Sequence, residues 1–346
     1  MSSTPGTPSS SSSPGGSRTV PGVPTTVLVA PDSFKGTLTA VEVADAIGRG
    51  LEAGDRPVDL CPIADGGEGT LEALAPALGA ELWAVTVPDP LGREIQARFA
   101  IGGAAAVVET AAASGLHLVA EHERDPLAAS TAGTGELILA AVDAGARTVY
   151  LGVGGSATSD GGAGAIRAIE RGGGLRRAKL IVLCDVRTPF EDAARVFGPQ
   201  KGASADDVRR LTKRLHGLAR RWDRDPRGVA MTGAAGGLSG GLWAAFGAEL
   251  VPGAAFVLDT IGFDSRLRAA RAVVTGEGKL DAQSLAGKVV SEVATRARQA
   301  GVPCHAIVGT SELDAFGARI LDLETVSEAG TPEQLQDAGR ALAAVL

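Results

Sequence analysis

Short apolar runs rich in β-branched residues alternate along the chain with segments of helical spacing. Residues 26–30 and 58–63 predict buried strands, and the apolar positions within 39–51 and 70–78 recur at the three-to-four-residue spacing of helices. Each of these predicted strands is followed by a polar loop and then by a helix. This order is typical of a doubly wound α/β layer, in which ligands bind beyond the carboxyl ends of the strands.

The middle of the chain has a different pattern. Residues 82–87, 95–101 and 105–109 predict strands joined by turns, which favours antiparallel pairing. Further along we expect a helix at 134–144, strands at 148–153 and 179–184, a helix at 206–222, and a glycine-rich loop at 233–241 leading into an apolar helix through 250. The doubly wound pattern then returns, with a strand at 272–275, a helix at 283–300 and a strand at 303–308.

These elements predict an α/β protein with a doubly wound parallel-sheet domain that is interrupted by a second, mixed α/β domain. We assign residues 25–64 plus 265–346 to the first domain and residues 65–264 to the inserted one. Residues 1–24 are rich in Ser, Pro and Gly and predict a disordered tail, because they carry too little apolar surface to bury. A cleft between two such domains is the default ligand site.

Composition narrows the class of protein. The 346 residues carry a net charge of −7, which opposes a nucleic-acid surface, and no apolar run is long enough to cross a bilayer. The three cysteines have no pairing or zinc spacing, which fits a reducing cytoplasm. We therefore expect a cytoplasmic protein without nucleic-acid or membrane partners.

Five islands pair glycine with acidic or basic residues in a way that core packing does not explain. They lie at 31–36, 64–70, 152–164, 197–202 and 275–281. Glycine lets the backbone approach a ligand closely or turn with positive φ, and a neighbouring carboxylate can hold a metal or accept a proton. The repetition predicts one dispersed polar site for a highly charged small ligand.

The islands suit phosphoryl transfer, which needs N–H groups and cations on the phosphates and carboxylates that hold Mg²⁺. The sequence has no P-loop, no dinucleotide-binding fingerprint and no His-Glu-x-x-His, and none of its four histidines lies in an acidic island. The candidates for holding Mg²⁺ or taking a hydroxyl proton are Asp65, Glu68, Asp160, Asp185, Glu277 and Asp281. Each of these acids could equally be a helix cap or a loop hydrogen-bond acceptor. The lysines in or beside the islands, which could bind a phosphate or a carboxylate, are Lys35, Lys201, Lys279 and Lys288.

At these islands the sequence resembles the bacterial type I glycerate kinases. The matching motifs, in order, are APDSFKG at 30–36, ADGGEGT at 64–70, GTGEL at 133–137, GGSATSDGGAG at 154–164, CDV at 184–186, VFGPQKGA at 196–203 and TGEGKLDAQSLAGK at 275–288. The resemblance implies ATP-dependent phosphorylation of D-glycerate, usually at the 2-hydroxyl, with Mg²⁺. It also implies a flavodoxin-like domain interrupted by a second α/β domain. One departure is that the segment between Ile169 and Lys179 is shorter than is usual in the family.

Combining the islands with the resemblance gives an expected site. We expect catalytic roles for Lys35, Asp65 and Asp185, and glycerate contacts from Ser33, Lys35, Glu68, Glu277 and Asp281. The ATP phosphates are expected against Gly154, Gly155, Ser156, Thr158, Asp160 and Gly161, and Mg²⁺ on Asp65, Asp185 and Glu277. The expected partners are D-glycerate and ATP, bound by a monomer or a homodimer.

Two alternatives stay open at this point. The shortened segment fits a degenerate copy that binds a nucleotide or sugar acid without turnover. Ser33 and Lys35 could also form the nucleophile pair of a Ser–Lys hydrolase.

Overall fold

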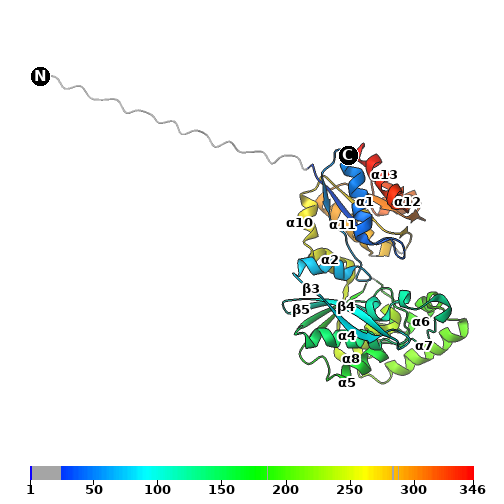
Figure 1. The fold of residues 1–346 in the computed structure, drawn as a ribbon. Coiled ribbons are helices and arrows are strands. Elements are labelled where there is room, and N and C mark those ends of the chain that lie inside the picture. The colour runs from blue at the N-terminus through cyan, green and yellow to red at the C-terminus, as the bar shows by residue number, and fades with distance from the viewer. Residues whose placement is uncertain (2–24, 185, 283, 287) are drawn as a thin grey trace.

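Two β-sheets form the frames of two lobes, with helix α2 (Thr70–Ala77) between them (Figure 1). The computed structural model describes residues 25–346 apart from 185, 283 and 287, together with residue 1. The expected disordered tail at 1–24 therefore lies, except for residue 1, outside the described residues.

The first sheet is wholly parallel. Its order is β13 (Thr325–Glu328), β11 (Cys304–Val308), β9 (Ala272–Gly276), β1 (Val27–Pro31) and β2 (Val58–Leu60). Counted along the chain within this sheet, that order is 2-1-3-4-5, the flavodoxin-like arrangement. The expected doubly wound layer is confirmed.

Both faces of this sheet are buried because the side chains of β1 alternate between two apolar clusters. Val27 and Val29 pack with α1 (Ala40–Glu52) and α13 (Pro332–Ala343), while Leu28 and Ala30 face the opposite side. The helices of that side are α9 (Gly253–Thr260), α10 (Phe263–Arg268) and α11 (Val289–Ala300). The short helix α12 (Ala315–Ile320) precedes β13.

The second sheet is mixed. Its order is β3 (Glu81–Pro88), β4 (Glu94–Gly102), β5 (Ala105–Glu109), β6 (Thr148–Gly152), β7 (Lys179–Cys184) and β8 (Glu249–Pro252), antiparallel as far as β5 and parallel beyond it. Helices α4 (Ala132–Asp143), α5 (Ala163–Arg171) and α8 (Ala234–Phe246) cover one face. Helix α3 (Thr110–Ser114) follows β5, and α6 (Ala193–Phe197) and α7 (Ala205–Ala219) form a satellite cluster around Phe190.

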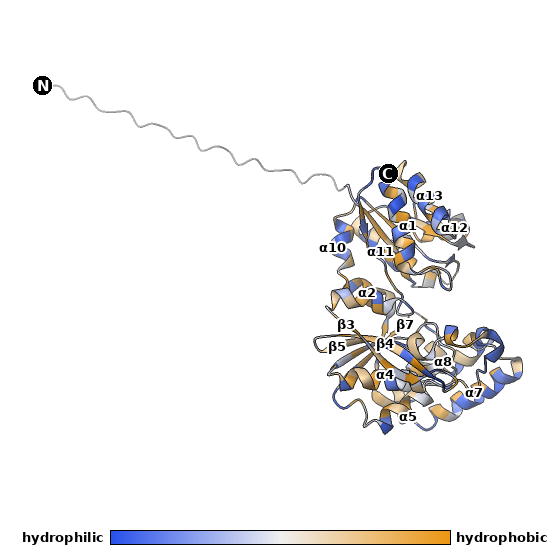
Figure 2. Ribbon diagram, viewed as in Figure 1, coloured by the Kyte–Doolittle hydropathy of each residue, from blue (hydrophilic) through white to orange (hydrophobic). Residues whose placement is uncertain are grey.

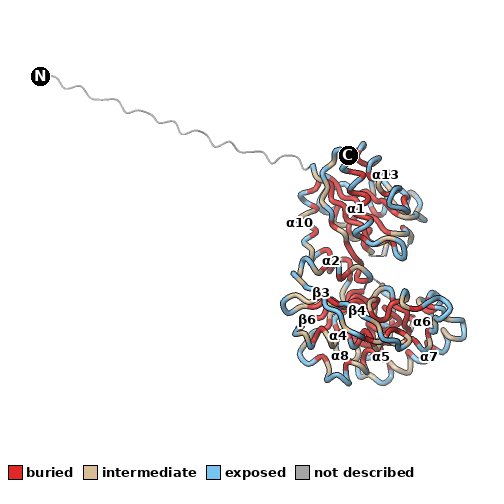
Figure 3. The backbone as a smooth tube through the Cα atoms, viewed as in Figure 1, coloured by how far each residue is buried: buried red, intermediate tan, exposed pale blue. Residues whose placement is uncertain are grey.

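One apolar cluster joins the two lobes. It contains Leu74 of α2, Val107 of β5, Val257 of α9 and Val273 of β9, all fully buried. Figure 3 shows this buried backbone running through both sheets, and Figure 2 shows polar residues gathering on outer helices such as α7. The shared core fixes the two lobes against each other, which matters because the site described below draws on both.

The sequence predicted most elements within a few residues. The strands expected at 105–109 and 179–184 have those bounds, the antiparallel middle is confirmed, and Thr39 caps α1 in a capping box with Glu42. The domain boundaries proposed at 64/65 and 264/265 stay predictions.

Two expected elements were wrong. The glycine-rich stretch at 233–241 lies largely within α8, whose chain makes a left-handed turn at Ala235, Gly236 and Gly237, and α8 ends at Phe246, so that residue 250 belongs to β8. The helix expected from 283 begins at Val289, after a 3₁₀ turn at Ser284–Ala286. Residue 283 lies outside the described part of the chain.

The shortened segment between α5 and β7 leaves the second sheet continuous. Gly173, Gly174 and Arg176 take positive φ and turn the chain directly from α5 into β7. Strands β6 and β7 then pair over their whole common length, from Thr148 opposite Lys179 to Gly152 opposite Leu183. The short connection is therefore accommodated by a tight turn rather than by a gap in the sheet.

All three cysteines, Cys61, Cys184 and Cys304, are buried thiols. Within the described ranges, no helix combines the length and the apolar character needed to cross a bilayer.

The crossing of α1 and α13 generates a stability prediction. A Cβ added at Gly50 would overlap the backbone oxygen of Gln336, so Gly50→Ala should lower the free energy of unfolding by roughly 2 kcal/mol. Gly217 is the matched control, because it lies in α7 with open space around the added Cβ, and Gly217→Ala should stabilise by about 0.5–1 kcal/mol. Urea unfolding of both variants checks this, and equal effects would contradict the close packing of α1 on α13.

Candidate functional site

A cleft of about 580 Å³ opens where the loop after β1 faces the second lobe. Its walls come from both lobes: Ser33, Lys35 and Glu42 on one side, and Glu68, Arg98 and Glu109 on the other. The β1 and β2 loops lie at the carboxyl ends of their strands, where ligands of open parallel sheets bind. The cleft is therefore the candidate active site.

An ion pair lies at this cleft, between the loops that follow β1 and β2. Lys35 Nζ donates to Asp65 Oδ2 at 2.7 Å, and Asp65 Oδ1 accepts the Gly67 N–H at 2.9 Å. The Asp65 side chain is 4% exposed and that of Lys35 is 62% exposed. The carboxylate is thus held from inside the protein, while the ammonium group stands at the cleft surface with access to a ligand.

Two more acids lie beside this pair. The Asp32 N–H donates to Gly276 O at 2.8 Å, which holds the end of β1 against the loop that carries Glu277. Burial raises the pKa of Asp32 well above its usual range, and the Asp65 carboxylate raises it further while Lys35 opposes the shift. Burial also raises the pKa of Glu277, against the hydrogen bond from Ser284 and the nearby lysines. Carboxyl groups are therefore concentrated around the Lys35–Asp65 pair, in a poorly hydrated place beside the cleft lining.

Glu277 has an unsatisfied oxygen. Its Oε1 is buried and has no hydrogen-bond partner among the described residues. A buried carboxylate oxygen without a donor is costly unless a cation or a ligand serves it. Among the residues that the structure describes, no three acids, histidines or cysteines converge as a ready metal cage.

The start of the glycine loop packs directly on the β2 loop. The Val153 N–H donates to Gly66 O at 2.8 Å, and a Cβ on Gly154 would stand 2.5 Å from Gly67 Cα. Only glycine permits this approach of two backbones. This packing brings Gly154 and Gly155 beside Glu68, so the glycine loop and the β2 loop lie next to each other.

Ser156 and Thr158 are tied to a lysine from another island. Lys201 Nζ donates to Ser156 Oγ at 2.9 Å and to the Thr158 carbonyl at 2.5 Å. Burial lowers the pKa of Lys201 to about 7, against the opposing charge of Asp160. Lys201 is buried, so its side chain supports the glycine loop from inside the protein and does not face the cleft.

Asp160 and Gly161 lie away from the cleft. The Asp160 carboxylate accepts hydrogen bonds from Thr131 N and Oγ1, Gly162 N and Gly164 N, which makes it an internal brace for the loop. Gly161 packs against Leu215 and Leu218 of α7. These two residues do not join the others expected to contact ATP.

Three of the expected site residues remain to be placed: Asp281, Asp185 and Ser33. The Asp281 N–H donates to Ser284 Oγ at 3.0 Å, on the loop that follows Glu277. Asp185 lies outside the described residues. The Ser33 N–H donates to Asp32 Oδ1 at 2.7 Å, and Lys35 pairs with Asp65, which gives the Ser–Lys hydrolase alternative no support.

Two acids were missed by sequence reasoning, one beside the Lys35–Asp65 pair and one in the cleft lining. Asp32 lies inside the first island but was not chosen, and Glu109 ends the apolar strand β5. Glu109 Oε1 accepts the Leu71 N–H at 2.8 Å at the start of α2, and burial raises its pKa to about 7, aided by Glu68 and Glu72. Their positions in the sequence could have indicated both acids, because Asp32 directly follows a buried strand and Glu109 ends one.

Comparisons with known proteins identify the family of the chain. A family model described as the glycerate kinase family matches residues 27–172 and 170–344. Glycerate kinase of Halalkalibacterium halodurans is 40% identical, covering 82% of this chain and 85% of that protein. Glycerate 2-kinase of Escherichia coli is 37% identical, covering 92% and 97%. A crystal structure from Salmonella typhimurium LT2, of a protein assigned as glycerate kinase 2, superposes with a TM-score of 0.76 at 35% identity, covering 92% of this chain and 97% of that one.

The buried position of Glu109 predicts a pH-dependent stability. Its folded pKa of about 7 lies above the ordinary value of 4.5, so its contribution to stability is full below pH 4.5 and is lost as the pH rises through 7. Glu109→Gln keeps the Oε1 acceptor but removes the charge. Between pH 5 and pH 8 the wild type should lose on the order of 2 kcal/mol more unfolding free energy than the variant. Parallel profiles in urea unfolding would contradict the buried, titrating Glu109.

Proposed function

Because the chain belongs to the glycerate kinase family, we propose that it transfers the γ-phosphoryl group of ATP to the 2-hydroxyl of D-glycerate in the cleft around Lys35. The observation that carries this proposal is the Lys35–Asp65 pair, where an exposed cation and a buried carboxylate meet in a cleft lined by both lobes. Phosphoryl transfer needs a cation near the phosphate oxygens and a positioned group that accepts the proton of the attacking hydroxyl.

Lys35 carries the positive charge that the reaction uses. Its ammonium group can donate to the glycerate carboxylate or to an oxygen of the transferring phosphoryl group, since its side chain stands at the cleft surface. The attacking hydroxyl oxygen forms a bond to the γ-phosphorus, the bond to the β,γ-bridging oxygen breaks, and ADP leaves. The hydroxyl proton passes to a carboxylate, for which we propose Asp65 or Asp185.

The phosphates of ATP are proposed to lie against the start of the glycine loop. Gly154 and Gly155 are partly or fully exposed beside Glu68, and backbone N–H groups in a glycine-rich turn can bind anionic oxygens. For Ser156 and Thr158 we propose that the backbone, rather than the side chain, contacts the phosphates. Asp160 and Gly161 act in it only by bracing the loop, because their contacts point into the protein.

Magnesium fits the acids of the cleft. We propose Asp65, Asp185 and Glu277 as its ligands, and the unsatisfied Oε1 of Glu277 supports this choice. Mg²⁺ commonly takes only one or two protein carboxylates and completes its shell with water and phosphate oxygens, so a preformed three-residue cage is not required. When bound, the ion supplies charge compensation for the phosphates. Ser33, Glu68 and Asp281 are proposed to complete the glycerate contacts.

We further propose a cytoplasmic enzyme that works as a monomer or homodimer, with glycerate and ATP as its small-molecule partners. The small number of cysteines and the absence of a pairing pattern in their spacing support a reducing compartment.

Phosphorus NMR of the products formed from D-glycerate and ATP tests the function. We expect 2-phosphoglycerate and ADP to form in proportion, and only when Mg²⁺ is present. Product phosphorylated at the 3-hydroxyl would overturn the regiochemistry. Binding of both substrates without turnover across a Mg²⁺ series would favour the degenerate copy instead.

In the same assay, Lys35→Met should lower kcat/KM by on the order of 10²–10³-fold, because it removes the cation of the cleft. Lys279→Met is the matched control, since Lys279 is exposed and pairs with Glu312 outside the cleft lining. It should change kcat/KM less than twofold. Similar losses in the two variants would count against the role of Lys35.

A further inference from the structure

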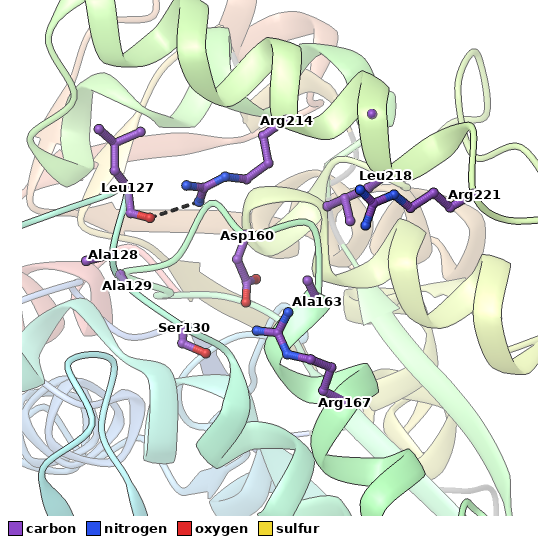
Figure 4. Close-up of a pocket in the computed structure, with 11 residues that line it drawn as sticks. Leu127, Ala128, Ala129, Ser130, Asp160, Ala163, Arg167, Arg214, Leu218 and Arg221 are labelled. Atoms are coloured by element: carbon purple, nitrogen blue, oxygen red, sulfur yellow. Dashed lines mark hydrogen bonds between the residues drawn. The ribbon is translucent and has the colours of Figure 1, made fainter.

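A second cavity, of about 460 Å³, lies at the far end of the glycine loop. It is bounded by the segment 127–130, by the start of α5 and by the last turns of α7, and it shares no lining residue with the interdomain cleft. Asp160 and Ala163 form part of its lining (Figure 4). Its volume suits a small metabolite.

Three arginines converge on this cavity. Arg167 extends from α5 toward Asp160, while Arg214 and Arg221 lie on the α7 side (Figure 4). None of the three forms an ion pair with any residue that the structure describes, although nine other arginines of the described chain do. All three residues are exposed, so water screens their mutual repulsion, and an anion bound between them would be attracted by each.

The arginines are partly preorganised. Arg214 Nη1 donates to the Leu127 carbonyl at 2.8 Å, which anchors the guanidinium at the rim and leaves its other N–H groups available. Ser130 Oγ accepts the Ala132 N–H at 3.2 Å, so its hydroxyl proton can still be donated. The cavity thus presents donors from three separate segments.

The one carboxylate in the lining does not cancel this charge. Asp160 is buried, and its oxygens already accept hydrogen bonds from Thr131, Gly162 and Gly164. Three guanidinium groups therefore face a single carboxylate whose acceptor positions are turned inward. An anion entering the cavity meets a net positive field.

We propose that this arginine pocket binds the phosphate groups of a small molecule, at a site separate from the interdomain cleft. The planar guanidinium fork matches the oxygens of a phosphate and binds them in pairs, and several arginines together favour a ligand with more than one negative charge. A nucleotide, a phosphorylated acid and free pyrophosphate all carry this chemistry. The proposal holds whether or not the chain phosphorylates glycerate.

Calorimetric titration without Mg²⁺ tests the proposal on the full chain with pyrophosphate, ADP and 2-phosphoglycerate. We expect at least one of them to bind the wild type, and its affinity to fall tenfold or more in the Arg214→Gln/Arg221→Gln double variant. Arg167→Gln, from the opposite wall, should weaken the same ligand. The ligand that responds identifies the source of the phosphate.

Two controls isolate the pocket. Lys213→Gln removes an exposed charge from α7 next to Arg214 but outside the lining, and it should change the affinity less than twofold. Lys35→Met removes the cation of the other cleft, so it should weaken only binding at that cleft, while the binding that the double variant removes should persist. Equal affinities in the wild type and the double variant, the absence of binding by all three ligands, or a loss that follows Lys35 instead would overturn the proposal. Urea unfolding of each variant verifies that it is folded.

Discussion

The ion pair between Lys35 and Asp65 is the contact on which the geometry of the cleft depends. Asp65 is buried and its other oxygen is fixed by the Gly67 N–H, so the pair holds the loop after β1 against the loop after β2. Exposed pairs contribute little to stability, and Lys35 is mostly exposed. The value of the pair lies in the position that it gives to a cation, beside the buried carboxyl groups of Asp32 and Glu277.

That excess of acid explains what the cleft can accept. Burial raises the pKa values of Asp32 and Glu277, because a poorly hydrated carboxyl group resists ionisation, and the Asp65 carboxylate raises that of Asp32 further. A triphosphate and a carboxylic acid add more negative charge. They can be held together there only with a cation and with backbone donors from the glycine loop, which packs directly on Gly66 and Gly67. The two lobes therefore contribute complementary parts of one site.

Much of this arrangement could be predicted from the sequence. The alternation of predicted strands and helices indicated the parallel sheet. The strand-end positions of Lys35 and Glu68 placed both in the lining of one cleft, and Asp65 and Glu277 interact with Lys35 there. The kink in α8 could not be predicted, because Gly236 turns there to let the backbone approach Thr158, a tertiary contact that glycine content alone does not specify. The role of Asp160 could not be predicted from the sequence either. A carboxylate in a glycine loop can serve a ligand or a brace, and only the direction of its hydrogen bonds distinguishes them. Asp32 and Glu109 were missed because desolvation depends on packing.

The most direct test of the central claim is a crystal structure of the chain with D-glycerate, Mg²⁺ and a non-hydrolysable ATP analogue. The account predicts that the glycerate or the γ-phosphate lies within hydrogen-bond distance of Lys35 Nζ, with the triphosphate against Gly154 and Gly155. Both substrates bound on a surface remote from Lys35 and Asp65 would contradict it.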